Sequence, residues 1–156
     1  MPPPNLALRS VRKLEEALEL APALDRRAAE FMAQFSDEPF PQGVTERFLR
    51  RHFDAPETVL LVARERKAGE LLGLCLTGPL EDPLLGQSVP MVLVLHVEVA
   101  ARHRGVARQM VDMVSELLAS RGLRRLAARV GHNDDALISM GERWGFVRVW
   151  ELMLRE

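Results

Sequence analysis

The chain has 156 residues, of which 47% are hydrophobic and 28% charged, and its formal net charge at pH 7 is -1. This composition is typical of one soluble globular domain over residues 1–156, and the near-neutral charge gives no electrostatic reason to expect nucleic acid or an anionic membrane as a partner. Cys75 is the single cysteine, which excludes an intrachain disulfide or a cysteine-based metal site. The histidines and carboxylates have no metal-ligand spacing, so no metal is predicted.

No targeting segment is evident at the start of the sequence. Residues 1–5 are expected to be flexible, and the charged, helix-like sequence after them lacks the apolar run of a signal peptide. The longest apolar stretch, residues 89–99, carries His96 and Glu98 and is too short to span a bilayer. These features predict a cytoplasmic protein without a membrane partner.

The first third of the chain is predicted to form a strand and two helices. Residues 6–11 form the strand, and residues 14–35 have helical periodicity that is interrupted at Pro22, with Asp25 as a second start. A loop with two prolines, residues 36–43, precedes a helix at residues 44–53.

The middle of the chain is predicted to form strands and then a strand that leads into a helix. Residues 58–64 and 71–77 are apolar runs joined by a turn, which indicates an antiparallel hairpin. A loop rich in proline and glycine, residues 78–90, is expected before the strand at residues 92–99 and the helix after Gly105.

The last elements complete an α/β order. A short strand is predicted at residues 123–130 and a helix at residues 134–144, and residues 147–156 leave room for one strand or a very short hairpin. This order of elements predicts an α/β fold with a mixed central sheet.

The most informative stretch is residues 92–111, an apolar strand that breaks at a cationic turn and continues as an amphipathic helix. Backbone N–H groups in the first turn of a helix have no intrahelical partner, and the helix dipole adds positive charge, so an anion is stabilised there. Gly105 and Ala107 let a ligand approach the backbone, and the turn also carries Arg102, Arg104 and Arg108. The turn therefore predicts a site for a diphosphate ligand.

This stretch resembles a known family. The pattern Arg102-x-x-Gly105-x-Ala107 after an apolar strand is similar to the pyrophosphate loop of the GNAT superfamily of N-acetyltransferases. The later strand, the helix ending in Gly145-Phe146, and Asn133 near the start of that helix follow the order typical of the family. The resemblance covers residues 57–146 and implies a GNAT-like fold, with a mixed, mostly antiparallel central sheet flanked by helices.

The resemblance also implies acetyl-CoA as co-substrate and indicates the residues that would hold it. Backbone groups near Val97 and Val99 would pair with the pantetheine arm, and the turn would bind the pyrophosphate. The expected cofactor-binding residues are Val97, Val99, Arg102, His103, Arg104, Gly105, Val106, Ala107, Arg108 and Asn133.

Two polar side chains near the end of this strand, His96 and Glu98, are the catalytic candidates. Alternation puts both on one face with Val92 and Val94. The other face is expected to carry Leu93, Leu95, Val97 and Val99. In the family such a residue often takes the amine proton through water, and His96 is the better base because an unperturbed imidazole titrates at about 6.5. In the alternative interpretation, His96 is a hydrogen-bonded core residue and Glu98 pairs with an arginine.

Gly141 marks a departure from the family pattern. Many members have a tyrosine at this position, four residues before the Gly-Phe pair, and it protonates the departing thiolate. This chain has no tyrosine at all. Either close packing of a strand or room for a bulkier acyl group would explain a glycine here, and thiolate protonation would fall to water or to His132.

Together these features predict an acetyl-CoA-dependent N-acyltransferase. It would transfer the acetyl group to a primary amine by direct attack in a ternary complex, with a small molecule or a peptide as acceptor and a homodimer as a compatible assembly. The alternative is a catalytically weak acyl-CoA-binding or regulatory protein of the same fold. A helix-turn-helix nucleic-acid binder is disfavoured by the strand between the two helices and by the near-neutral charge.

Overall fold

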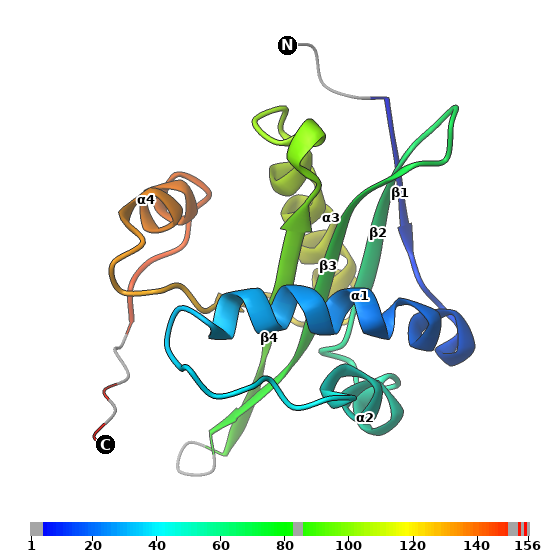
Figure 1. The fold of residues 1–156 in the computed structure, drawn as a ribbon. Helices are drawn as coiled ribbons and strands as arrows, with labels where there is room; N and C mark the ends of the chain where they lie inside the picture. Colours follow the sequence, from blue (N-terminus) through cyan, green and yellow to red (C-terminus); the bar gives the residue numbers. More distant parts are fainter. Residues whose placement is uncertain (1–4, 83–85, 150–152, 154, 156) are drawn as a thin grey trace.

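The computed structural model describes residues 5–82, 86–149, 153 and 155. Figure 1 shows a central sheet with helices on both of its faces. The elements are β1 (Leu6–Ser10), α1 (Leu14–Met32), α2 (Val44–His52), β2 (Leu60–Glu65), β3 (Leu71–Asp82), β4 (Gln87–Val97), the short helical turn η1 (Val99–Ala101), α3 (Val106–Ser120), β5 (Ala127–Ala128) and α4 (Asp135–Arg143).

The sheet is mixed and mostly antiparallel, as the sequence predicted. Its strands lie in the order β1-β2-β3-β4-β5. The first four pair antiparallel, whereas β5 runs parallel to β4 and pairs with it only at Met91 and Val92. Within the described ranges, the part of β4 beyond Val92 therefore has a strand neighbour on the β3 side alone.

Alternating side chains of the strands build one apolar core on each face of the sheet. In β2, Leu60 and Val62 point to the face covered by α1 and α2, whereas Leu61 and Ala63 point to the face covered by α3. Figure 1 shows α1 crossing in front of the sheet and α3 lying behind it. A ligand at the end of β4 can thus be approached by groups from both layers.

The first helix is continuous, and the predicted interruption at Pro22 is wrong. α1 runs from Leu14 to Met32 with Pro22 inside it. Pro22 is exposed, so water can solvate the carbonyl that the proline leaves without a helical donor. Ala21 and Leu24 flank the proline and are buried in the core, which holds the two halves of the helix in line.

The predicted loop at residues 78–90 is also wrong, because most of it continues the hairpin. β3 extends to Asp82, β4 begins at Gln87, and the two strands pair throughout these extensions. Pro79 and Pro90 lie directly opposite each other. Their missing N–H groups therefore fall on a single rung of the ladder, and the hairpin tolerates both prolines.

A β-bulge in β4 changes the predicted faces of two residues. Val94 pairs with Leu76 and Val92 pairs with Thr77, so Leu93 is the extra residue. Val92 consequently packs in the α3 core, and Leu93 joins Val94 in the core under α1 and α2. The prediction that Val92 shares a face with Val94, and that Leu93 lies opposite, fails because one inserted residue reverses the alternation.

The carboxyl-terminal strands are shorter than expected. The strand predicted at residues 123–130 is reduced to Ala127–Ala128, because its partner β4 bulges immediately after Val92. None of Val147, Arg148, Val149, Met153 and Arg155 is in a strand. The other positions of the predicted last strand, and the predicted flexible residues 1–4, lie outside the described residues.

The described residues contain neither a candidate membrane span nor a candidate metal cluster. None of the helices found there is long and apolar enough to cross a membrane. These residues also contain no group of three or more His, Cys, Asp or Glu side chains that could hold a metal ion.

Gly78 is required by close packing between α2 and the sheet. A Cβ at this position would overlap the Phe48 ring and lie 2.9 Å from Cδ1 of Leu93. We expect Gly78→Ala to lower the free energy of unfolding by about 1–3 kcal/mol, as overpacked core substitutions do. Urea denaturation measures the change.

Gly141→Ala provides the matched control for Gly78→Ala. Its Cβ would meet only Cβ of Phe146, at the ordinary contact distance of 3.9 Å. Because alanine favours a helix over glycine by about 1 kcal/mol, this variant should be at least as stable as the parent chain. Equal effects of the two substitutions would contradict the packing argument.

Candidate active site

Side chains from two separate elements meet at the carboxyl end of β4. Nε2 of His96 lies 3.3 Å from Oε1 of Glu98, and Nη2 of Arg27 on α1 lies 3.5 Å from the same oxygen. His96 is 9% exposed, whereas the Glu98 side chain is 40% exposed. The result is a buried imidazole joined to a half-exposed carboxylate, with an arginine on the same carboxylate oxygen.

The surroundings of His96 keep its imidazole neutral at neutral pH. Burial lowers the pKa of His96 below its ordinary value of 6.5, and the positive charge of Arg27 lowers it further. Glu98 raises the pKa through its charge and its hydrogen bond, but the lowering effects prevail. Because the Glu98 carboxylate can only accept a hydrogen bond, Nε2 of the neutral His96 donates to it, and Nδ1 is the nitrogen that can take a proton as a general base.

The backbone of β4 beside this pair faces a position that β5 does not reach. The N–H of Glu98 donates to the Leu72 carbonyl of β3 at 2.8 Å. Because successive residues of an antiparallel ladder point their backbone groups to opposite sides, those of Leu95 and Val97 point away from β3. The Val97 carbonyl accepts a bond from Nε of Arg102 at 2.9 Å. An extended ligand could pair with what remains of this edge.

Val99 lies in a different environment from Val97, the other residue predicted to bind the pantetheine arm. It belongs to η1, its side chain is 74% exposed, and its carbonyl accepts the Arg102 N–H at 3.3 Å. Of the two residues predicted for backbone pairing, only Val97 thus lies on β4 itself.

The turn before α3 has the geometry of an anion site. Gly105 precedes the helix with φ of 80°, and no side chain caps the helix at that residue. The N–H groups of Val106, Ala107 and Arg108 lie in the first helical turn, where they have no intrahelical acceptor. His103 also has a positive φ, 60°, so the turn is shaped by two left-handed residues.

The arginines of the turn are held by the protein itself. Besides the bond of Arg102 to Val97, Nε of Arg108 donates to both carboxylate oxygens of Asp112 at 3.1 Å. The Arg108 guanidinium also lies 6.0 Å from the centre of the Trp144 ring. Arg104 is half-buried. The turn thus offers backbone N–H groups at the start of α3, and the arginines supply positive charge around them.

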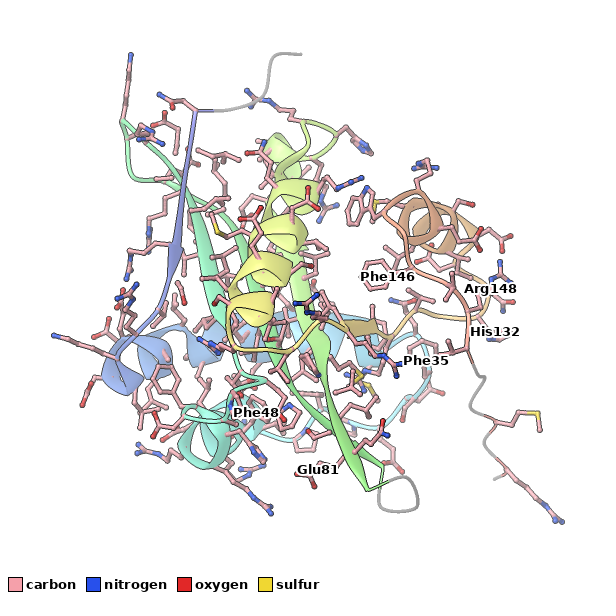
Figure 2. All side chains as sticks on the ribbon, turned by 180° about the vertical axis from the view of Figure 1, so that it is seen from behind. Phe35, Phe48, Glu81, His132, Phe146 and Arg148 are labelled. Carbon is pink, nitrogen blue, oxygen red and sulfur yellow. The ribbon has the colours of Figure 1, made fainter. Side chains whose placement is uncertain are left out.

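A hollow of about 320 Å³ lies between the end of α1 and the loop before α4. Its lining residues are Gln34, Phe35, Gly131, His132, Asn133 and Asp134. Figure 2 shows His132 near Phe35. His132 and Asn133 are thus brought together, but His132 belongs to this hollow and not to the His96 cluster. The cap of α4 is Asp134, whose carboxylate accepts the Leu137 N–H, so Asn133 precedes the cap.

A larger hollow, of about 400 Å³, lies elsewhere on the chain. It is formed by residues 87–90 at the start of β4 and residues 122–125 after α3. Because His96 lies near the other end of β4, this hollow is remote from the acid-base pair.

Gly141 is not imposed by packing. The nearest atom to a Cβ at this position, outside the helix backbone, would be Cβ of Phe146 at 3.9 Å. Close packing of a strand, one of the two explanations predicted for this glycine, therefore does not apply. A side chain at position 141 would begin with its Cβ at an ordinary contact distance from Phe146, so the packing leaves room for one.

A family model identifies the family of the chain. The model for the acetyltransferase (GNAT) family matches residues 21–146, which is more than half of the chain. The chain belongs to the GNAT family of acetyltransferases. A search of curated protein sequences found no match.

Solved structures of GNAT acetyltransferases share this fold. The aminoglycoside N-acetyltransferase AAC(6')-Iy, in complex with a CoA bisubstrate analogue of acetylneamine, is 17% identical with a TM-score of 0.68, covering 97% of each chain. A ribosomal-protein-alanine N-acetyltransferase from Brucella melitensis is 18% identical with a TM-score of 0.62, covering 97% of this chain and 98% of that one. A predicted acetyltransferase with acetyl-CoA from Clostridium acetobutylicum is 12% identical with a TM-score of 0.69, covering 97% and 96%. At these identities the likeness concerns the fold.

Arg27 is the site residue that sequence reasoning missed. It lies 71 positions before Glu98 and is one of many arginines, so no local pattern distinguishes it. Only the packing of α1 against β4 brings the two side chains together.

Titration of His96 tests the electrostatics of the pair. NMR of the imidazole C–H signals should give a pKa below 6.5, because burial and Arg27 both oppose protonation. As the pH falls from 6.5 towards this folded-state pKa, the unfolded chain binds a proton first, and the folded state loses stability. A His96 pKa at or above 6.5 would mean that Glu98 dominates the environment.

Proposed function

We propose that this GNAT protein transfers the acetyl group of acetyl-CoA to a primary amine by direct attack in a ternary complex. The observation that carries the proposal is the His96–Glu98 pair, 3.3 Å apart, beside the edge of β4 that β5 does not reach and shortly before the turn that begins α3. One continuous stretch of chain therefore carries a candidate general base, a strand edge for the thioester arm and a turn for the phosphates.

Acetyl-CoA fits the donors of this stretch. The N–H groups of Val106, Ala107 and Arg108 would hold the pyrophosphate, and the left-handed Gly105 lets it approach the backbone. Val97 at the end of β4 and Val99 at the start of η1 would meet the pantetheine arm. The remaining proposed contacts surround these groups: Arg102, His103, Arg104 and Asn133.

His96 and Glu98 would prepare the amine for attack. A primary amine arrives largely protonated at neutral pH, since an unperturbed alkylammonium has a pKa of about 10.4. The half-exposed Glu98 carboxylate can bind the ammonium, and Nδ1 of the neutral His96, whose Nε2 donates to Glu98, can take its proton through water. A C–N bond then forms at the thioester carbon while the C–S bond breaks, the attacking nitrogen gives up its second proton to water, and the thiolate takes a proton from water or His132.

Direct attack is supported by the state of the only cysteine. Cys75 is fully buried in the core under α3, and burial raises the pKa of its thiol to about 12. A buried, protonated thiol is a poor nucleophile, so a route through an acyl-cysteine has no candidate in this chain.

The acceptor is proposed to be a small-molecule or peptide amine. Solved relatives of the same fold include enzymes named for aminoglycosides and for a ribosomal-protein alanine. A second candidate function is acyl-CoA binding with weak catalysis. It is favoured by one observation, that the position where many family members have a tyrosine is a glycine with room for a side chain.

Thiol release in the presence of acetyl-CoA and a panel of amines tests the transfer. We expect His96→Gln and Glu98→Gln each to lower kcat by about 100-fold or more, the usual loss on removing a general base. CoA affinity, measured by calorimetry, should remain unchanged. His52→Gln is the matched control, because His52 lies on α2 against Phe48.

Two results would overturn the proposed transfer. CoA binding without turnover of any amine would favour the second candidate function. Absence of CoA binding would contradict both functions.

Gly105→Ala tests the cofactor turn. The left-handed φ of 80° costs alanine about 1–2 kcal/mol, so the turn should distort and CoA affinity should fall about tenfold. Gly69→Ala is the control, since Gly69 has a φ of 71° in the turn between β2 and β3. Equal losses of affinity in the two variants would show that general destabilisation, and not the turn, is responsible.

A further inference from the structure

Arg27 connects the helix layer to the acid-base pair. Its Nη1 bonds Oε1 of Glu30 at 2.9 Å within α1, and its Nη2 reaches Oε1 of Glu98 at 3.5 Å. The Arg27 side chain is 26% exposed, so it is largely enclosed between α1 and the sheet. Its guanidinium can serve both carboxylates because its donors form a rigid planar fork.

Glu98 needs such a partner to have a fixed orientation. It follows the last residue of β4, and its side chain is 40% exposed. One of its oxygens, Oε1, accepts hydrogen bonds from both His96 and Arg27. With Oε1 held from two sides, the second oxygen of this half-exposed carboxylate would be the one that binds an ammonium.

We propose that Arg27 is a positioning residue for the acetyl transfer, fixing the Glu98 carboxylate against Nε2 of His96 so that its other oxygen meets the acceptor amine. The proposal rests on the proposed function. Arg27 touches neither substrate in this arrangement and acts through Glu98.

The positioning role of Arg27 can also be tested through the pKa of His96, because charged groups surround that imidazole. The groups that face the imidazole are Arg27 and, behind it, Glu30 from α1, Glu98 from the end of β4, and Arg102 from the turn. Arg27 and Arg102 lower the pKa of His96, and Glu98 raises it. Removing the charge of Arg27 must therefore raise the pKa of His96 and move the acid limb of kcat/KM to higher pH.

Arg27→Met and Arg27→Lys separate charge from geometry. Arg27→Met should lower kcat about tenfold, leave the KM for acetyl-CoA unchanged and shift the acid limb upward. Arg27→Lys should restore the position of the acid limb but only part of kcat, because an ammonium lacks the planar fork. Arg26→Met is the control, since it removes the same charge from the neighbouring, exposed position of α1, and it should retain kcat and the pH profile.

The outcomes distinguish this proposal from the proposed function. NMR titration of His96 in Arg27→Met requires no turnover, and a raised pKa supports the contact even if no amine is acetylated. An unchanged His96 pKa together with an unchanged kcat overturns the role of Arg27. A rise in the KM for the amine alone, with kcat retained, also overturns it, because it assigns Arg27 to binding. If Arg27→Met fails to fold, Arg27→Gln serves for the same measurements.

Discussion

The site depends on β4 losing its parallel neighbour part of the way along its length. β5 pairs with Met91 and Val92, and the bulge at Leu93 follows at once. A bulge bends a strand and increases its twist, which separates β4 from β5 beyond this point. Among the described residues, no further strand lies beside β4 there, and such an edge accepts another extended chain or ligand.

The same bulge arranges the side chains around this edge. After Leu93, the residues Val94 and His96 face the layer of α1 and α2, while Leu95 and Val97 face the layer of α3. The titratable group therefore lies on one side of the edge. The helix with the anion-binding turn covers the other side. An acyl donor lying along the edge would be reached by an acceptor amine from the α1 side, where Arg27 and Glu98 are held.

Much of this arrangement could be predicted because its determinants are local in sequence. The turn from Arg102 to Ala107 combines glycine, alanine and arginine at fixed spacing, and the apolar strand before it is unmistakable. Its left-handed Gly105 and the start of α3 at Val106 agree with that pattern. The mixed sheet followed from the order of the elements.

The errors arise where distant residues decide the local structure. The bulge at Leu93 depends on register with β3, and the sequence there, residues 91–95, is apolar without interruption and gives no sign of it. Pro79 and Pro90 indicate a loop until they are seen to face each other across the hairpin. Arg27 becomes part of the site only through the packing of α1 on the sheet. In each case a tertiary contact overrides the local propensity.

Hydrogen exchange with and without CoA tests the central claim most directly. If CoA lies along the open edge of β4 and on the amino terminus of α3, the amides of Val97, Val106, Ala107 and Arg108 should exchange more slowly when it is bound. Protection confined to residues 87–90 and 122–125, around the larger hollow, would contradict the account. Unchanged exchange throughout the chain at saturating CoA would contradict it equally.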